Sequence, residues 1–255
     1  MSGVLKDKVA IVTGSSRGFG KVFALRFAEE GAKLLLTTTN LERAEGTVKE
    51  VKAKGGEVAI MEADISHEDA GKGIAEKVMQ QYGRVDILVN NAAIWYGVNP
   101  KPWDAWTIEE WDRMFTVNVR GNWLVSKAIA PLMIKQKKGK IINIGSDVFK
   151  SPDSHMFLHY ALTKSAIYSL THALATALGP SGINVNAIAP GLAATEAGLG
   201  LDVSKKLFES VVAAQMIKRR VEAEDVVGAA VFLASADSDL ITGQLIMVNG
   251  GHLML

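Results

Sequence analysis

A tyrosine and a lysine four positions apart are the residues of this chain best suited to chemistry. Tyr160 and Lys164 lie in the segment YALTK, at the start of a predicted helix over residues 158–178, and residues four apart share one helix face. A free tyrosine, with a pKa of about 10, holds its proton too tightly to exchange it at neutral pH, and a neighbouring ammonium favours the phenolate. The pair therefore predicts a proton donor for carbonyl reduction that is also a proton acceptor for alcohol oxidation.

A serine after a strand places a hydroxyl beside that pair. Ser146 follows the apolar run KIINI at residues 140–144 and lies 14 positions before Tyr160. Successive elements of a parallel sheet bring both side chains to its carboxyl edge, where Ser146 is expected to hydrogen-bond the substrate oxygen. Simpler explanations exist, because a Tyr-x-x-x-Lys pair often marks only a helix face and a serine after a strand often forms a turn.

Glycines follow the first apolar run of the chain. Residues 13–20 read TGSSRGFG, with Gly14, Gly18 and Gly20 between a predicted strand and a predicted helix. Without β-carbons the backbone bends tightly and approaches a pyrophosphate, which the helix N-terminus attracts through its N–H groups and its dipole. The spacing is G-x-x-x-G-x-G rather than G-x-G-x-x-G, and taken alone it also fits a plain turn.

The elements that would position these residues alternate between strand and helix. Short, continuously apolar runs are typical of strands buried on both faces, and the alternation predicts parallel strands with right-handed crossovers. The predicted strands are residues 9–13, 33–38, 57–61, 85–89, 140–144, 184–188 and 244–248, and the predicted helices are residues 18–30, 41–54, 67–82, 111–134, 158–178 and 223–234. The expected fold class is α/β: a single-domain, Rossmann-type, doubly wound parallel sheet with helices on both faces, over residues 1–255.

The longest stretch without a predicted element is residues 191–218, which contains three glycines. Because it follows a strand end, it is expected to be either a mobile lid over a site at the carboxyl edge or an ordinary surface excursion. The pattern does not separate the two.

Composition argues against several other kinds of protein. The 255 residues carry a net charge of +1 and no cysteine, so no global field attracts nucleic acid or an anionic membrane, and cysteine chemistry is excluded. No signal peptide or apolar run of about 18 residues is recognisable, so a cytoplasmic protein without membrane partners is expected. His155 and His159 lie four apart without a further ligand, so no metal site is expected.

Taken together, these motifs resemble those of the short-chain dehydrogenase/reductase family. The resemblance rests on TGSSRGFG, Asp64 after the third predicted strand, Asn90-Asn91-Ala92-Ala93 after the fourth, Asn118, Ser146 and YALTK in that order, and Pro190-Gly191 after the sixth. It covers essentially the whole chain, with Ala93 and Asn249 departing from the family's usual glycine and aspartate. It implies an NAD(P)-dependent enzyme that interconverts a carbonyl and a secondary alcohol by hydride transfer.

The resemblance also assigns roles to residues. It implies a catalytic tetrad in which Asn118, holding a water beside the lysine, joins Ser146, Tyr160 and Lys164. The implied cofactor-binding residues are Gly14, Ser16, Arg17, Gly18, Phe19, Gly20, Thr39, Asp64, Ile65, Asn91, Ala92, Ala93, Tyr160, Lys164, Pro190, Gly191 and Thr195. A homotetramer or homodimer, formed through the long helices and the last strand, is implied as well.

The residues after the second predicted strand bear on the choice of nucleotide. An acid there would bind the ribose hydroxyls and repel a 2′-phosphate, but residues 37–40 read TTTN and no acid precedes Glu42. Arg17 can pair with a 2′-phosphate and Thr39 can donate a hydrogen bond, so NADP is favoured. NAD is the alternative, because NAD users of the family share this glycine motif. Arg43 fits a second phosphate contact or a solvated helix face.

Residues next to the catalytic positions are expected to line the substrate pocket. They are Trp95 and Tyr96 after NNAA, Asp147, Val148 and Lys150 after the serine, and Met156 and Phe157 before the catalytic helix. The mixture is largely aromatic, which favours a small-molecule ketone or alcohol with an apolar or aromatic body. A small polar acid recognised by Lys150 is the alternative.

Two other functions would use the same residues differently. One is an inactive dinucleotide-binding sensor or scaffold, since fold does not fix function, although such a protein has no need of an intact tetrad. The other is a serine hydrolase that pairs Ser146 with His155 or His159. Residues 144–148 read IGSDV, which is not the G-x-S-x-G elbow of such hydrolases.

Overall fold

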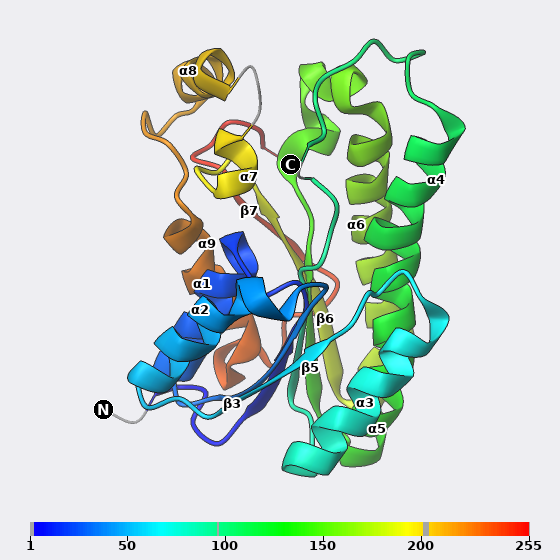
Figure 1. The fold of residues 1–255 in the computed structure, drawn as a ribbon, viewed down its shortest axis with the longest axis vertical. Helices are drawn as coiled ribbons and strands as arrows, with labels where there is room; N and C mark the ends of the chain where they lie inside the picture. Colours follow the sequence, from blue (N-terminus) through cyan, green and yellow to red (C-terminus); the bar gives the residue numbers. More distant parts are fainter. Residues whose placement is uncertain (1–2, 96, 201–203, 255) are drawn as a thin grey trace.

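Seven parallel strands form one sheet at the centre of the structure (Figure 1). The computed structural model describes residues 3–95, 97–200 and 204–254. The strands of this part of the chain are β1 (Val9–Val12), β2 (Lys33–Thr38), β3 (Val58–Glu62), β4 (Ile87–Asn90), β5 (Gly139–Ile144), β6 (Ile183–Pro190) and β7 (Leu245–Val248). Their order is β3-β2-β1-β4-β5-β6-β7. The sheet therefore grows in opposite directions from the β1/β4 boundary, where open α/β sheets bind their ligands.

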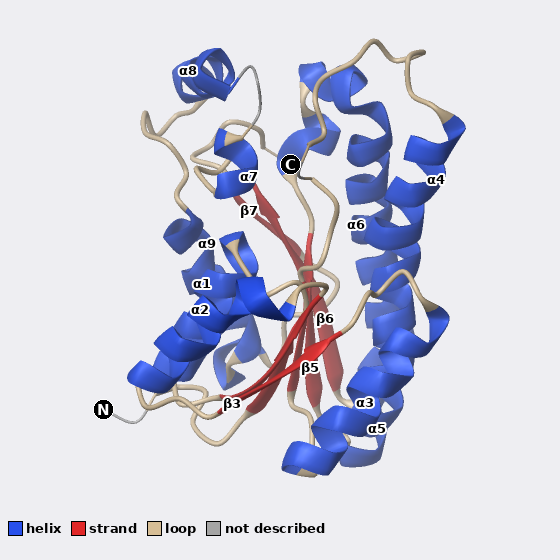
Figure 2. Cartoon of the chain, viewed as in Figure 1, coloured by secondary structure: helices blue, strands red, loops and turns tan. Residues whose placement is uncertain are grey.

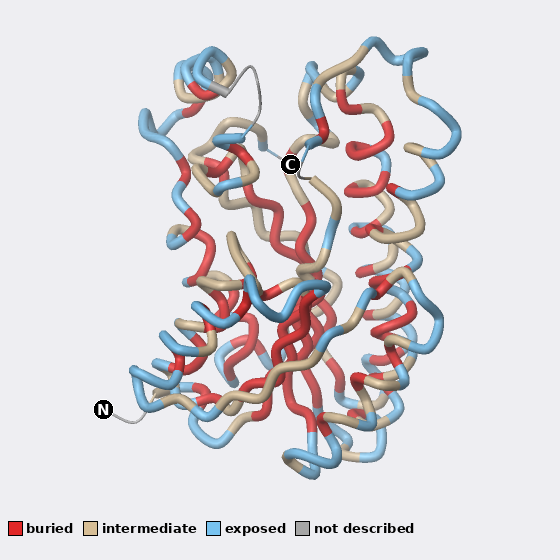
Figure 3. Tube along the Cα trace, viewed as in Figure 1, coloured by how far each residue is buried: buried red, intermediate tan, exposed pale blue. Residues whose placement is uncertain are grey.

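Helices cover both faces of the sheet (Figure 2). One face carries α1 (Gly18–Glu29), α2 (Leu41–Ala53) and α9 (Ala223–Ala234), and the other carries α3 (Glu68–Tyr82), α5 (Asn122–Gln136) and α6 (Leu158–Leu178). Alternate strand residues point to opposite faces, so Ala10 and Val12 pack in the first layer while Val9 and Ile11 pack in the second. Figure 3 shows burial concentrated in the strands between these layers. The predicted fold class is confirmed.

The predicted helix over residues 111–134 is in fact interrupted. It begins earlier, as α4 (Ile108–Phe115), passes through a π-helical turn at Thr116–Gly121, and continues as α5 to Gln136. The earlier start follows from a capping box, because the Thr107 hydroxyl accepts from the Glu110 N–H and the Glu110 side chain accepts from Thr107. The π turn contains Asn118, and such bulges are frequent at functional sites.

The stretch after β6 holds two helices where none was predicted. They are α7 (Glu196–Leu199) and α8 (Ser204–Ala214). Thr195 caps α7, since its hydroxyl accepts from the Gly198 N–H at 3.3 Å, and Phe208 of α8 is buried. The short length of α7, with Gly198 inside it and Gly200 directly after it, hides it from pattern analysis. Short 3₁₀ turns also occur at Asp147–Lys150, Pro152–Phe157, Gly179–Ser181 and Ala236–Ser238.

Among the described helices, none combines the length and the apolar character that a bilayer-spanning segment needs.

The glycine turn after β1 leaves no room for side chains. Gly14 has a φ of +64°, and a β-carbon there would lie 2.8 Å from Cα of Ala92. A β-carbon on Gly20 would lie 2.3 Å from the carbonyl oxygen of Gly14. The turn is therefore packed directly against the backbone that follows β4, and α1 begins in contact with the turn itself.

The Gly20→Ala substitution should lower the free energy of unfolding by more than about 2 kcal/mol, because the new methyl group meets rigid backbone. Gly46, in the middle of α2, is the matched control, since nothing lies within 4 Å of a β-carbon built there. Gly46→Ala should raise the free energy of unfolding by about 0.5–1 kcal/mol. Urea denaturation of both variants measures this. Equal effects of the two substitutions would contradict the packing described for the turn.

Candidate active site

Two adjoining cavities lie at the carboxyl edge of the sheet. The larger has a volume of about 580 Å³, within the range of small-molecule sites, and it runs from the glycine turn to Lys164. The smaller, of about 120 Å³, lies on the far side of Tyr160 and is lined by Ser146. Tyr160, Trp95 and Phe19 line both cavities.

Asn91 holds the glycine turn in place from the neighbouring strand. Its side-chain amide donates to the carbonyl oxygens of Thr13 and Gly14 at 2.9 and 3.0 Å. The backbone N–H groups of Asn91 and Ala92 both donate to the Thr13 hydroxyl at 3.0 Å. The two strand ends on either side of the β1/β4 boundary are thereby locked together, so the amide of Asn91 orients the turn.

Most of the residues expected to bind a dinucleotide surround the larger cavity. Those that line it are Gly14, Ser16, Arg17, Gly18, Phe19, Thr39, Asp64, Ile65, Asn91, Ala92, Ala93, Tyr160, Lys164 and Thr195. Pro190 and Gly191 line the smaller cavity instead, and Gly20 packs beneath the turn. The side-chain-free turn and the length of the cavity fit an extended phosphate-linked ligand.

Further residues line this cavity, including Arg43, for which either a phosphate contact or a solvated helix face was expected. Arg43 and Arg113 add positive charge to its wall, and Thr38 lines it beside Thr39. Arg43 lies one helical turn into α2, directly after the Asn40 cap, so the cap signal places it near the end of β2. Arg113 belongs to α4 and comes from a distant part of the sequence, so no local pattern indicates it.

Asp64 is a turn residue that also faces the larger cavity. Burial raises the pKa of its carboxyl, but hydrogen bonds from Ser66 outweigh this and hold the pKa below its usual range. The Ser66 N–H donates to Asp64 Oδ1 at 2.9 Å. Its carboxylate is therefore ionised at neutral pH and available to a ligand.

Tyr160 and Lys164 meet in the buried space between β5 and α6. Lys164 Nζ donates to the carbonyl oxygen of Ile144 at 2.9 Å and lies 5.5 Å from the centre of the Tyr160 ring. Burial lowers the pKa of Lys164 to about 8, so the amine is mostly protonated at neutral pH. Burial also raises the pKa of Tyr160, and hydrogen bonding with Ser146 opposes this increase. The expected lowering of the phenol's pKa by Lys164 is not seen in this arrangement.

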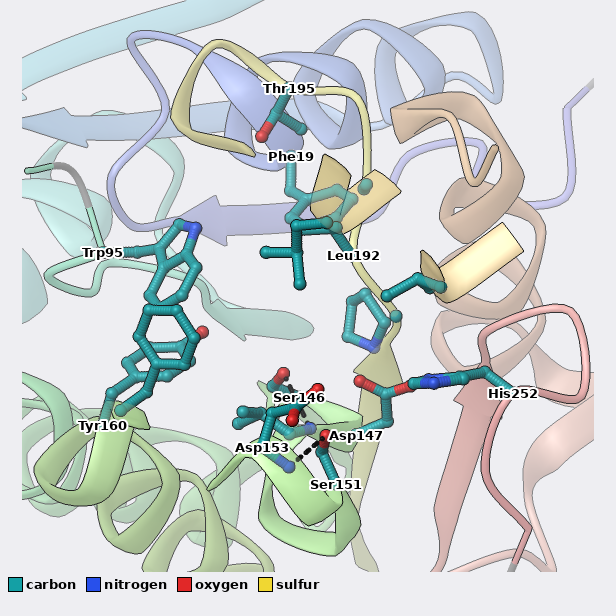
Figure 4. A pocket seen from close by; sticks show the side chains of 18 residues that line it. Phe19, Trp95, Ser146, Asp147, Ser151, Asp153, Tyr160, Leu192, Thr195 and His252 are labelled. Carbon is teal, nitrogen blue, oxygen red and sulfur yellow. Dashed lines mark hydrogen bonds and ion pairs between the residues drawn. The ribbon is translucent and has the colours of Figure 1, made fainter. Parts of the chain in front are cut away.

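Ser146 and Asn118 complete the predicted set from two different elements. Ser146 follows β5, and its hydroxyl accepts from the Val148 N–H at 3.2 Å, facing the smaller cavity (Figure 4). Asn118 is fully buried in the π turn. Its Oδ1 accepts from the Ile94 N–H at 2.7 Å, and its amide donates to the Thr163 hydroxyl at 3.3 Å. Asn118 therefore ties the segment after β4 to the helix that carries Tyr160 and Lys164.

The smaller cavity has an aromatic side. The ring of Trp95 lies 4.3 Å from that of Tyr160 and 5.2 Å from that of Phe157, and Val148 completes this wall. Met156 packs against the same cluster without lining the cavity. Lys150 is exposed and is absent from the lining. Tyr96 lies outside the described residues.

The opposite side of the smaller cavity is polar and was only partly expected. Asp147 is 5% exposed, and its Oδ2 accepts from Asn249 Nδ2 at 3.1 Å. His252 Nδ1 lies 3.4 Å from the same oxygen, so two side chains that follow β7 hold a carboxylate that follows β5. Leu207 and Val211 of α8 close the cavity. The stretch after β6 is thus part of the site wall rather than an ordinary surface excursion.

The two histidines considered as hydrolase partners lie elsewhere. His155 Nδ1 contacts the Pro152 carbonyl oxygen at 3.0 Å. His159 is buried, with its ring centre 3.7 Å from that of Trp106. Neither hydrogen-bonds Ser146, so the geometry does not supply a base for a serine nucleophile.

Comparisons with known proteins cover nearly all of the chain. The family model described as enoyl-(acyl carrier protein) reductase matches residues 14–252. Galactitol 2-dehydrogenase of Agrobacterium fabrum is 36% identical, over 98% of this chain and 99% of that protein. The (2S)-[(R)-hydroxy(phenyl)methyl]succinyl-CoA dehydrogenase subunit BbsD of Thauera aromatica is 35% identical, over 97% of each chain. A solved xylitol dehydrogenase with bound NAD⁺ superposes with a TM-score of 0.90 at 30% identity, over 97% of this chain and 99% of that one.

Lys164→Met should stabilise the protein at pH 7 by about 1–3 kcal/mol, because it removes a buried charge. The folded pKa of Lys164 is about 8, below its usual 10.5. Between these values the unfolded chain holds a proton that the folded chain has released, so the native protein gains stability as the pH rises through this window. The difference between variant and native protein should therefore shrink by pH 10.

Denaturation at pH 7 and pH 10 measures this effect. The exposed Lys135→Met of α5 is the control and should change stability by less than about 0.5 kcal/mol at either pH. A destabilised Lys164→Met at pH 7 would mean that the hydrogen bond to Ile144 outweighs the cost of burial.

Proposed function

This chain belongs to the short-chain dehydrogenase/reductase family of oxidoreductases, and we propose that it interconverts a ketone and a secondary alcohol with a nicotinamide dinucleotide. The observation that carries this proposal is the position of Tyr160 on the wall shared by two cavities. One cavity begins at a glycine turn suited to a pyrophosphate, and the other is lined by Ser146. A phenol on the wall between them can exchange a proton with a substrate, and a dinucleotide held by the residues of the larger cavity would supply or accept the hydride.

In the reducing direction, a bound NADPH or NADH supplies the hydride that reduces the carbonyl carbon. Ser146 donates a hydrogen bond to the carbonyl oxygen and holds it toward the phenol. Tyr160 then gives its proton to that oxygen, so the carbonyl becomes a secondary alcohol. In the oxidising direction the Tyr160 phenolate removes the same proton.

Lys164 and Asn118 act on this proton transfer. The buried ammonium of Lys164 lies 5.5 Å from the centre of the Tyr160 ring, and it stabilises the phenolate that forms there in a medium of low polarity. Burial raises the pKa of Tyr160 and so disfavours the phenolate. The ammonium offsets this cost at the moment when the phenol gives up its proton. Asn118 fixes the π turn against α6 and keeps room for a water beside the lysine.

We favour NADP as the nucleotide, with NAD as the alternative. Arg17 of the glycine turn and Arg43 of α2 line the larger cavity, as do Thr38 and Thr39 at the end of β2. Guanidinium groups are suited to a 2′-phosphate, and no carboxylate from the end of β2 opposes one. The solved xylitol dehydrogenase holds NAD⁺, so the family resemblance alone does not decide the choice.

The proposal extends to assembly and location. One domain over residues 1–255 would hold both the cofactor and the catalytic residues, in the cytoplasm. A homotetramer or homodimer is favoured by apolar side chains exposed on the two long helices, Trp123 on α5 and Leu162 and Tyr168 on α6. Burying such side chains between copies of the chain removes apolar surface from water.

Tyr160→Phe should lower kcat by about 10²–10⁴-fold, because it removes the transferred proton, while nucleotide binding persists. Tyr168→Phe, at an exposed position of the same helix, is the control and should leave turnover unchanged. Nucleotide absorbance during ketone reduction and fluorescence titration of NADPH measure the two properties. Full turnover of Tyr160→Phe would refute its role. If the native protein bound the nucleotide but turned over no ketone, the inactive dinucleotide-binding sensor or scaffold would be favoured.

Thr38→Asp should move the ratio of kcat/KM for NADPH over NADH by about tenfold toward NADH, because the carboxylate repels the 2′-phosphate and accepts from the ribose hydroxyls. Thr38→Asn is the control of equal size without the charge. Thr38 is buried and hydrogen-bonded to Asn40, so thermal unfolding of each variant is measured as well. An unchanged ratio in a folded Asp variant would place the selectivity elsewhere.

A further inference from the structure

The smaller cavity differs in character between its two sides (Figure 4). Trp95 and Tyr160 form the aromatic side, and Asp147 and His252 lie across from them. Ser146, which follows β5 directly before Asp147, lies between the two sides. A substrate whose oxygen rests on Ser146 therefore has one arm toward the rings and one toward the carboxylate.

The carboxylate of Asp147 is a built feature of the cavity. It is 5% exposed, and Asn249 and His252 both contact its Oδ2. Gly191 keeps this region compact, since a β-carbon there would lie 2.9 Å from Asn249 Cβ and 3.4 Å from Asp147 Oδ2. Burying a carboxylate is costly unless donors satisfy it, and Oδ1 retains the capacity to accept another hydrogen bond.

The charge of the lining limits what can lie beside Asp147. The described residues that line the smaller cavity include two carboxylates, Asp147 and Asp153, and neither lysine nor arginine. An anionic group would meet like charge in a medium of low polarity, and a purely apolar arm would leave Oδ1 without a donor. An ammonium would have to lose its water, and Oδ1 of Asp147 alone would be left for its three N–H donors, because Asn249 and His252 already contact Oδ2. A hydroxyl satisfies the site without adding charge.

On this basis we propose that Asp147, held by Asn249 and His252, is a hydroxyl-binding subsite, and that the substrate is a neutral hydroxylated ketone or the corresponding polyol. The hydroxyl is placed one or two carbons from the reacting carbon, because Ser146 and Asp147 line the same small cavity, of about 120 Å³. This inference rests on the proposed function and specifies its substrate class. Among the relatives, those named for galactitol and xylitol are polyol dehydrogenases by their names.

Matched ketones test the proposal with the native enzyme and NADPH or NADH. Hydroxyacetone and 2-butanone have the same number of heavy atoms and differ by a hydroxyl in place of a methyl group. We expect kcat/KM for hydroxyacetone to exceed that for 2-butanone by about 10- to 100-fold. The kcat/KM values for acetoacetate and aminoacetone should be lower than the value for hydroxyacetone. In the oxidising direction, kcat/KM for galactitol or sorbitol should exceed kcat/KM for 2-hexanol.

Variants of the subsite locate this preference. Asp147→Leu should bring the ratio of hydroxyacetone to 2-butanone close to one, whereas Asp147→Asn, which keeps an acceptor, should retain part of it. His252→Leu, which removes one of the two side chains that hold the carboxylate, should lower the ratio as well and covers the case in which Asp147→Leu does not fold. Asp237→Leu, at an exposed position after α9, is the control and should leave the ratio unchanged.

The outcomes separate this inference from the proposed function. Reduction of 2-butanone as efficient as that of hydroxyacetone, or a preference for acetoacetate or aminoacetone, would overturn the hydroxyl subsite while confirming a ketone reductase. A hydroxyl preference that survives in a folded Asp147→Leu and in His252→Leu would also overturn it. No oxidation or reduction of any of these compounds with either nucleotide would count against the proposed function itself.

Discussion

A buried ammonium at the end of a central strand is the constraint on which the site depends. Lys164 donates to the last carbonyl oxygen of β5, at Ile144, and burial lowers the pKa of its amine to about 8. The same hydrogen bond fixes the start of α6 relative to β5, so Tyr160 and Ser146 reach one place from two elements. A charge in such surroundings lowers stability, and the apolar layers on both faces of the sheet compensate for it.

The parts of the molecule that follow local rules were predictable from the sequence. The strands are short and apolar because both of their faces are buried, and this pattern led to the correct sheet and layers. The glycine turn was recognisable because Gly14 needs a positive φ and Gly20 has no space for a side chain. The spacing of Tyr160 and Lys164 placed both on one helix face, and the structure brings them together with Ser146 as expected.

What the sequence did not reveal depends on contacts between distant segments. The π turn at Asn118 produces no hydrophobic period of its own, so a single helix was expected. The first helix after β6, α7, is only four residues long, and the burial of Phe208 in α8 depends on the tertiary fold. Burial is the main influence on the pKa of Tyr160. The spacing of Tyr160 and Lys164 in the sequence does not show how deeply the phenol is buried. Arg113 and His252 reach their cavities only through the tertiary fold.

The hold of Asn249 and His252 on Asp147 separates the residues that shape the smaller cavity from those that build the sheet. The glycine turn, Asn91 and Lys164 lie on one side of the reacting centre and are tied to backbone, so substitutions there disturb the sheet itself. Asn249 and His252 contact Asp147 through side chains beyond the ends of β5 and β7, so a change among these three residues leaves the strand pairing in place. The choice of metabolite can therefore be redesigned without rebuilding the redox apparatus.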